Sequence, residues 1–551
     1  MRRIKRLSAV LTALMAILLI QESRKQGEYK KSFSKECSSE QVVIQKGKYK
    51  QPLADIQKKE HQIQEETFEL EKKENRKSVQ AVQKAIDFNC DTNCPRNTMI
   101  DFDLMLPAKN LSAFPVIPFS LTYPATKKKD WLKPTIETFG INALVWIYDW
   151  HIQKRAWANI SIDSIIKNIN KGYAWDNNGF QCNQIEHPFH GSMYFAAART
   201  NGLNFWESII FPFLGSFTWE VALENERPST NDQIMSSFGG IALGEALFRL
   251  SDLIANEESG GIERGARETL TFIVNPVVGS NRLITGKTFR MGSNSEKHYY
   301  DLRFSIGASD VHNFLTGIDL EYKDAIEDEK PKINPYDYFR FEFKIKLNNN
   351  GLKNEKILTS GLLFGKKIKI LSSEDNLVGL FSVFDYISIP TNRVSTIGLG
   401  PGIVGNFNFG SDLFLNTFGV LSGIFGGSTS SFALKYGKNI FVENGESHHF
   451  GPENNPYYLG PGIAGKLNLE LGKKGLGSIQ VNLSQYWIHS MFVVNANEYI
   501  TRLCPRINLN ITKWLQIRFE NEFYFKKGTY KNYPSIWNKN CYFRTFCIVR
   551  F

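Results

Sequence analysis

The sequence predicts an α+β protein, in which an N-terminal α-helical domain is followed by a C-terminal antiparallel transmembrane β-barrel of about 12 strands. Apolar residues recur at helical spacing from Trp131 to about Phe272, and after Asn275 the period changes to two. About a dozen alternating segments follow, each close to the ~9–11 residues that a tilted strand needs to cross a bilayer. The chain ends on such a segment, with Phe551 as its last residue.

The composition favours this combination over other classes of protein. The 551 residues exceed one ordinary domain, and 42% of them are hydrophobic although no long apolar run occurs beyond the N-terminal region. A helical-bundle membrane protein is therefore disfavoured. The net charge of +11 is spread over the tail, the turns and the polar strand positions. No nucleic-acid motif accompanies it, so we expect no nucleic-acid partner.

The N-terminal region is expected to lie outside the two folded domains. Residues 1–21 predict a signal peptide, because a basic start precedes an apolar run from Leu7 to Ile20. An uncleaved anchor is the alternative, since no small-x-small cleavage site ends this run. Residues 22–87 are rich in Lys, Glu and Gln and predict a charged tail that is flexible or helical. Residues 88–130 are punctuated by prolines and predict a linker.

Seven cysteines are an odd number for an exported chain, so at least one has no disulfide partner within the monomer. Cys90 and Cys94 are spaced to close a small disulfide loop in an oxidising compartment. A zinc site there would need two further ligands, and none stands out nearby in the sequence. We therefore favour a disulfide or free thiols, and we assign no metal site.

The helical domain is expected at residues 131–275. Its helices are expected to cover roughly Pro134–Ala158, Pro188–Thr200, Phe205–Leu223 and Ser229–Ile254. Ser229 followed by Asp232 resembles a capping arrangement, in which the carboxylate also lies near the positive end of the helix dipole. Gly240 and Gly244 form a GxxxG step, which normally lets another backbone approach closely.

The barrel is expected at residues 297–551. In Tyr338–Leu347 the apolar residues Phe339, Phe341, Phe343, Ile345 and Leu347 alternate with Arg340, Glu342, Lys344 and Lys346. Leu515–Phe525 repeats the pattern with few exceptions. Apolar-outward and polar-inward alternation over many strands is typical of a transmembrane barrel.

Two further features support a repetitive sheet that ends in a strand. LGPGIVGNFNF from Leu399 matches LGPGIAGKLNL from Leu459, 60 residues later. Glycines so placed suit bends or bulges in a curved sheet. The terminal Phe551 resembles the C-terminal signal that the barrel-assembly machinery reads in outer-membrane proteins. We therefore expect that machinery and outer-membrane lipid as partners.

The densest group of polar residues lies in the helical domain, between Trp175 and Ser251. The order D-x-N-x-F-x2-N-x3-HP-x2-G, then AR-x-NG, WE-x3-E, PS-x-ND and GG-x3-GE resembles the domain of unknown function 3943 family. This resemblance implies an exported protein whose helical segment precedes a β-rich C-terminal region, and it implies no known activity. The matching positions include Asp176, Asn183, His187, Pro188, Gly191, Arg199, Glu207, Trp219, Glu220, Asn231, Asp232, Gly240 and Glu245.

Within this motif, four residues are candidates for catalysis: His187, Glu220, Glu224 and Asp232. Glu220 and Glu224 would share one helical face, and His187 could pair with one of them as a general base or metal ligand. In the structural alternative, these carboxylates cap helices and pair with Arg199 or Arg249. We favour the structural alternative, because no nucleophile elbow or HExxH sequence accompanies the candidates.

Two functions follow from these patterns. The first is a Gram-negative outer-membrane barrel with a periplasmic-side helical domain, a non-enzymatic envelope component that handles or gates lipid or small solutes. The alternative is an envelope hydrolase or lipid-modifying enzyme that uses the His/Glu/Asp candidates. Convergence of the four side chains around one solvent-reached cavity would favour the alternative, whereas side chains that point separately into packing would favour the first function. The sequence indicates no cofactor, ligand or oligomeric state.

Overall fold

The computed structural model describes residues 120–121, 129–175, 179–255, 259–290, 296–310, 313–327, 333–348, 351–370, 373–389, 392–430, 440–443, 446–449, 457–490, 495–531 and 533–551. The expected signal peptide, charged tail and most of the linker lie outside the described residues, as do Cys90, Cys94 and Asp176. The helices and the barrel belong to one compact unit that includes residues 116–551.

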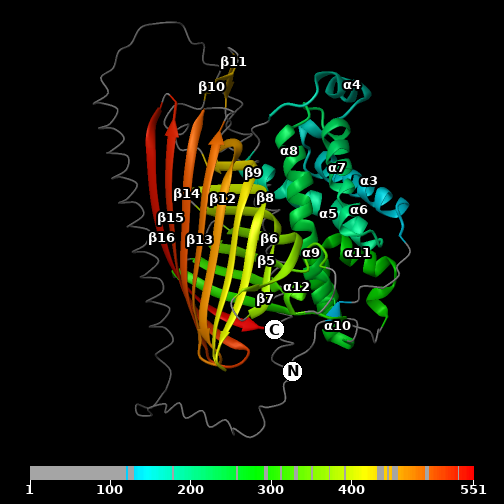
Figure 1. Ribbon diagram of the computed structural model, residues 1–551. Coiled ribbons are helices and arrows are strands. Elements are labelled where there is room, and N and C mark those ends of the chain that lie inside the picture. Colours follow the sequence, from blue (N-terminus) through cyan, green and yellow to red (C-terminus); the bar gives the residue numbers. More distant parts are fainter. Residues whose placement is uncertain are drawn as a thin grey trace, which may run out of the picture. The chain divides into compact units, whose positions relative to one another are not determined.

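The first part of the described chain is helical, as predicted (Figure 1). Its α-helices are α3 (Leu132–Ile147), α4 (Ile162–Lys171), α5 (His187–Thr200), α6 (Phe205–Ser208), α7 (Ile210–Thr218), α8 (Thr230–Ile234), α9 (Gly240–Ile254), α10 (Gly261–Val274) and α11 (Pro276–Ile284). Short π-helical segments extend or join some of them: Tyr148–Ile152 after α3, Cys182–Glu186 before α5, Trp219–Leu223 after α7 and Met235–Gly239 between α8 and α9.

The ends of these helices follow from local chemistry. The Ser229 hydroxyl accepts a hydrogen bond from the backbone N–H of Asp232, so the predicted cap is confirmed. The first predicted helix ends before Ala158, because Lys154 has a φ of 56° that no α-helix includes. The third is divided into α6 and α7, where Pro212 has no N–H to donate to the carbonyl of Ser208.

The close approach predicted for the GxxxG step is confirmed, and the partner is α5. A Cβ atom added to Gly240 would lie 2.6 Å from the backbone of Gly191 in α5. A Cβ atom added to Gly191 would lie 1.8 Å from the backbone oxygen of Ser236. The motif glycines therefore let α5 pack directly on the Met235–Gly239 segment and α9.

The C-terminal part is a closed antiparallel barrel of twelve strands, which confirms the predicted fold class. The strands are β3 (Tyr300–Asp310), β4 (Asn313–Tyr322), β5 (Phe339–Asn348), β6 (Gly351–Ile370), β7 (Ser373–Ile389), β8 (Asn392–Phe409), β9 (Leu413–Ser430), β12 (Tyr457–Lys473), β13 (Gly477–Ser490), β14 (Ala496–Asn510), β15 (Leu515–Tyr530) and β16 (Tyr533–Arg550). Strand β16 pairs with β3 to close the barrel, with Thr545 opposite Ala308.

Small elements complete the described chain. They are β1 (Ser120–Leu121) paired with β2 (Glu296–Lys297), β10 (Ile440–Glu443) paired with β11 (Glu446–His449), α12 (Asp324–Glu327) between β4 and β5, and the 3-10 helices Ala156–Ala158 and Lys287–Phe289. The glycines of the repeated sequence lie in β8 and β12, and a register shift between Gly460 and Gly462 forms the expected bulge. The strands approach so closely that a Cβ atom on Gly400 would lie 1.9 Å from the Leu421 oxygen.

The outer face of several strands is covered by the helical domain. Phe339 and Phe341 of β5 point out of the barrel, as the alternation predicted, yet they are 0% and 4% exposed. They belong to one buried cluster with Phe195, Phe205, Ile241, Leu247, Leu250, Tyr322, Phe384, Tyr386 and Ile397. Where we expected lipid, these strands therefore contact α5, α6 and α9. An apolar wall has the same alternation whether lipid or a helix covers it.

Candidate functional site

Three of the four candidate residues come together in the helical domain. His187 begins α5, Glu220 lies in the segment after α7, and Asp232 lies in α8. One ligand atom from each lies within 4.8 Å of the other two. The side chain of His187 is 11% exposed and that of Asp232 is 3% exposed, and Glu220 is 1% exposed as a residue. The cluster is therefore nearly shielded from solvent, with the imidazole as its most accessible member.

The His187 ring is held from two sides. Its Nε2 lies 3.4 Å from Asp232 Oδ2, and its Nδ1 lies 3.2 Å from the hydroxyl oxygen of Ser236. Ser236 follows Asp232 by four residues, so one helical turn supplies both contacts. Pro188 lies in the first turn of α5, where its fixed φ angle favours the start of the helix next to His187. The sequence interpretation missed Ser236, although its spacing from Asp232 was a usable signal.

Neighbouring motif residues hold the two carboxylates. Asp232 Oδ1 accepts a hydrogen bond of 2.9 Å from the side-chain amide of Asn231. Glu220 Oε2 accepts one of 2.9 Å from the backbone N–H of Ser229, whose hydroxyl also caps α8. The PS-x-ND part of the motif thus positions the acidic members of the cluster.

Glu224 does not enter this group of three. The helix ends at Leu223 and Glu224 has extended backbone angles, so Glu224 lacks the helical position that would place it on the face of Glu220. Its Oε1 accepts a hydrogen bond of 2.7 Å from the indole N–H of Trp219. This contact turns the carboxylate toward a motif tryptophan.

A second buried group joins the helical domain to the barrel. Glu245 of α9 accepts hydrogen bonds from Arg199 Nε at 2.7 Å and from Arg249 Nε at 2.8 Å. Arg249 also lies 3.2 Å from Asp337, in the connection before β5. The structural alternative had expected the two arginines beside Glu220 and Glu224. Their shared partner Glu245 is 0% exposed, which indicates a structural role.

Other motif residues also have structural contacts. The side-chain amide of Asn183 donates to the Tyr457 hydroxyl on β12 at 2.5 Å. Glu207 forms a capping box with Asn204 at the start of α6 and pairs with Lys129. Much of the motif therefore stabilises the helical domain and its contact with the barrel strands.

Near the His187 cluster, three ionisable side chains have pKa values shifted in favour of their neutral forms. Burial, with a smaller effect of nearby His187, lowers the pKa of His190 to about 3, so this imidazole is uncharged. Burial and then the charge of Glu220 raise the pKa of Tyr173 to about 12. Tyr194 also has a raised pKa for these two reasons, and its hydroxyl donates to Asn142.

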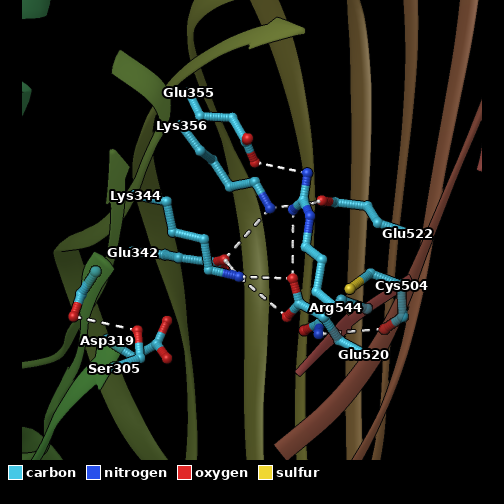
Figure 2. Close-up of polar contacts among 12 residues, drawn as sticks. Ser305, Asp319, Glu342, Lys344, Glu355, Lys356, Cys504, Glu520, Glu522 and Arg544 are labelled. Carbon is cyan, nitrogen blue, oxygen red and sulfur yellow. Dashed lines mark hydrogen bonds and ion pairs between the residues drawn. The ribbon is translucent and has the colours of Figure 1, made fainter. Parts of the chain in front are cut away.

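The barrel interior contains a second concentration of charge (Figure 2). Lys344 of β5 lies 2.8 Å from Glu520 of β15, and Lys356 of β6 lies 2.5 Å from Glu522 of β15. These strands are not neighbours in the sheet, so the ion pairs cross the lumen. Figure 2 shows these pairs together with Arg544 and Glu355, which are 2.7 Å apart.

A cavity of about 680 Å³ lies on one side of these ion pairs. It is at the end of the barrel where β16 finishes and where short turns join β8 to β9 and β12 to β13. Its lining is charged and polar, and includes Asp301, Arg303, Glu470, Lys473, Asn510 and Arg550. We call it the vestibule. Further along the lumen, the Asn392 amide of β8 donates to Asn540 of β16 at 3.0 Å, which bridges opposite walls.

These features define the class of protein. A closed antiparallel barrel with a polar interior and an apolar outer face is the transmembrane barrel of bacterial outer membranes. Residues 172–277 match the family model described as Domain of unknown function (DUF3943), so the resemblance inferred from the motif is confirmed for this segment. No curated protein matches the sequence.

Solved outer-membrane proteins are similar to the barrel at low identity. An outer membrane channel from Pseudomonas putida is 9% identical, with a TM-score of 0.24, over 46% of this chain and 94% of that chain. OmpT of Vibrio cholerae is 7% identical, with a TM-score of 0.16, over 47% and 99%. The outer membrane channel DcaP of Acinetobacter baumannii is 8% identical, with a TM-score of 0.16, over 46% and 94%.

Proposed function

We propose that this protein hydrolyses an ester bond of an outer-membrane lipid, at the cluster of His187, Glu220 and Asp232. The observation that carries the proposal is the convergence of these three motif residues from separate segments, within 4.8 Å of one another. Two carboxylates and an imidazole offer acceptors for a proton of water. Water attacks the ester carbonyl as it loses this proton, the bond to the alcohol breaks, and the proton passes to the leaving alcohol.

The closed lumen supports an action outside the barrel. Among the described residues, ion pairs and hydrogen bonds cross the interior between strands that are not neighbours. Arg502, Arg518 and Arg544 are among the largest fully buried side chains of the molecule. A solute passing through would have to separate buried charges, each costly to leave unpaired. The barrel is thus better suited to anchor the helical domain than to conduct.

The surface of the helical domain supports contact with lipid. On α3 the polar Thr138 and Asn142 are buried at 0% and 1% exposure, while Leu132 and Leu144 are each 69% exposed and Ile136 is 61% exposed. Water would favour the opposite arrangement. Further exposed apolar residues on the helices are Ile166, Ile169, Ile210, Phe217, Phe272, Leu283 and Ile284. No helix in the described part of the chain is both long and apolar enough to cross a membrane.

The buried contact of the helices with the outer face of the strands and the exposed apolar residues of the helices support a lateral position of the helical domain, beside the barrel and against lipid, in place of the periplasmic-side position expected from the sequence. In such barrels the longer loops usually face outward, and the longest connection between barrel strands, from Ser430 to Tyr457, is at the other end, so the vestibule would face the periplasm. The contact of Arg249 with Asp337 lies near the vestibule end of the barrel, and the contact of Asn183 with Tyr457 lies toward the opposite end. The His187 cluster would then act on lipid along the wall.

A second candidate function is supported by the vestibule. Its volume of about 680 Å³ and charged lining suit a small polar solute, as in the non-enzymatic envelope component expected from the sequence. Binding there would leave His187 uninvolved. The two functions therefore respond differently to substitution in the helical domain.

The test uses the full-length protein purified in detergent and placed in vesicles of ester-linked phospholipid or of extracted outer-membrane lipid. We expect release of fatty acid by the wild type, loss of release in His187→Ala, and unchanged release in His151→Ala, which removes an exposed histidine of the same domain. Heat-modifiable migration on gels verifies a folded barrel in each sample. No release by the wild type from either vesicle, or equal release by His187→Ala, would refute the proposal.

A further inference from the structure

We propose that His187, Glu220 and Asp232 bind one divalent metal ion of the zinc class. The inference deepens the proposed function and rests on it for the role of the ion, but the binding itself can be measured separately. No metal site was assigned from the sequence, because no HExxH or other catalytic signature accompanies the three residues, which are separated by 33 and 12 positions along the chain.

The distances fit zinc coordination by nitrogen and oxygen. Zinc binds these atoms at ~2.0–2.2 Å, so two ligands of a tetrahedral ion lie roughly 3.3–3.6 Å apart. His187 Nε2 and Asp232 Oδ2 are 3.4 Å apart, which already equals that separation. All ligand atoms of the cluster are within 4.8 Å, so Glu220 needs only a small side-chain movement to complete the set.

The residues behind the three ligands form the support that metal sites require. The second ring nitrogen of His187, Nδ1, faces the Ser236 hydroxyl at 3.2 Å, which leaves Nε2 as the coordinating atom. The Asn231 amide holds the other oxygen of Asp232, and the Ser229 N–H holds Oε2 of Glu220. Each proposed ligand is therefore oriented by a separate hydrogen bond, in which Asn231 and Ser229 donate and Ser236 accepts from His187 Nδ1, and all three partners come from the segment 229–236.

Charge points to the same conclusion. Two buried carboxylates so close together repel each other, and a divalent cation would neutralise both at once. One imidazole and two carboxylates suit zinc better than the harder magnesium or calcium ions, which favour oxygen ligands alone. Three protein ligands leave a fourth position for water, as in catalytic and not structural zinc sites. An ion here would lower the pKa of its bound water, so hydroxide would form without a protein base and the three side chains would act as ligands of the ion.

Zinc content is the measurement that tests this inference. The full-length protein carries serine at every cysteine except the buried Cys504, because thiolates are zinc ligands and would add to the zinc count. After equilibration with micromolar Zn²⁺ and gel filtration, we expect about one zinc ion per chain. His187→Ala and Asp232→Asn should remove this ion, while His151→Ala should retain it. Ser236→Ala should weaken binding by ~10–100-fold, as loss of a supporting hydrogen bond does.

The outcomes separate the two proposals. A wild type without zinc, or an Asp232→Asn variant that keeps it, would overturn the metal site even if His187-dependent hydrolysis were observed. Zinc bound through His187 and Asp232 without any lipid hydrolysis would retain the site and refute the proposed reaction. The zinc content of the wild type is sufficient to refute the metal site. The test therefore does not depend on whether a variant folds.

Discussion

Glu245→Gln should destabilise the helical domain far more than an ordinary surface substitution. The Glu245 carboxylate accepts hydrogen bonds from Arg199 at 2.7 and 3.2 Å and from Arg249 at 2.8 Å, and it is 0% exposed. Glutamine has the same size but no charge, and its amide would direct donors at a guanidinium group. Removing one partner of a buried charged group costs ~3–5 kcal/mol, so we expect a loss of this size in the free energy of unfolding.

Tryptophan fluorescence during denaturant unfolding in detergent can measure this loss. Seven of the ten tryptophans lie between Trp131 and Trp219, so the signal reports mainly on the helical domain. Glu263→Gln is the matched control, since Glu263 forms a partly exposed i,i+4 pair with Arg267 that should contribute only ~0.3–0.5 kcal/mol. A loss below about 1 kcal/mol in Glu245→Gln, similar to the control, would refute the reasoning.

Two further predictions concern packing and the lumen. Gly240→Val should lower the free energy of unfolding by at least ~1–3 kcal/mol, because even a Cβ atom would lie 2.6 Å from the Gly191 backbone. The yield of folded protein should fall as well. A variant as stable as the wild type would contradict the close approach of the two helices. The wild type should show no steady ion conductance in planar bilayers, whereas a Glu520→Ala, Glu522→Ala double variant should show current, because it removes the carboxylates that cross the lumen to Lys344 and Lys356. Conductance by the wild type equal to that of the variant would contradict a closed interior.

The sequence predicted the parts of the fold that depend on local period. Alternation in residues 338–347 predicted a strand whose phenylalanines point outward, and Ser229 with Asp232 predicted the start of a helix. Both predictions were possible because each pattern lies within one element. What covers Phe339 could not be predicted, since an apolar outer face is compatible with both lipid and helices. The contact depends on Phe195 and Leu247, which are far away in the chain.

The candidate site was predicted in part for the same reason. The motif identified His187, Glu220 and Asp232 without showing that they meet, and only tertiary structure brings three segments together. The shared helical face of Glu220 and Glu224 depended on a helix that in fact ends at Leu223. Cross-lumen pairs such as Lys344 with Glu520 were not predicted, because alternation specifies the inward face but not which strands lie opposite.

The central claim is that the helical domain lies beside the barrel in contact with lipid, and quenching by brominated lipid tests it most directly. A fluorophore is attached to one introduced cysteine at Ile136 of α3, at Ile463 on the outer face of β12, or at Lys474 in a turn, in a background in which all seven native cysteines are replaced by serine. If the helical domain lies against lipid, brominated chains should quench the label at Ile136 as strongly as the label at Ile463, while iodide in the water should quench the label at Lys474. Quenching of the Ile136 label by iodide and not by brominated lipid would contradict this claim.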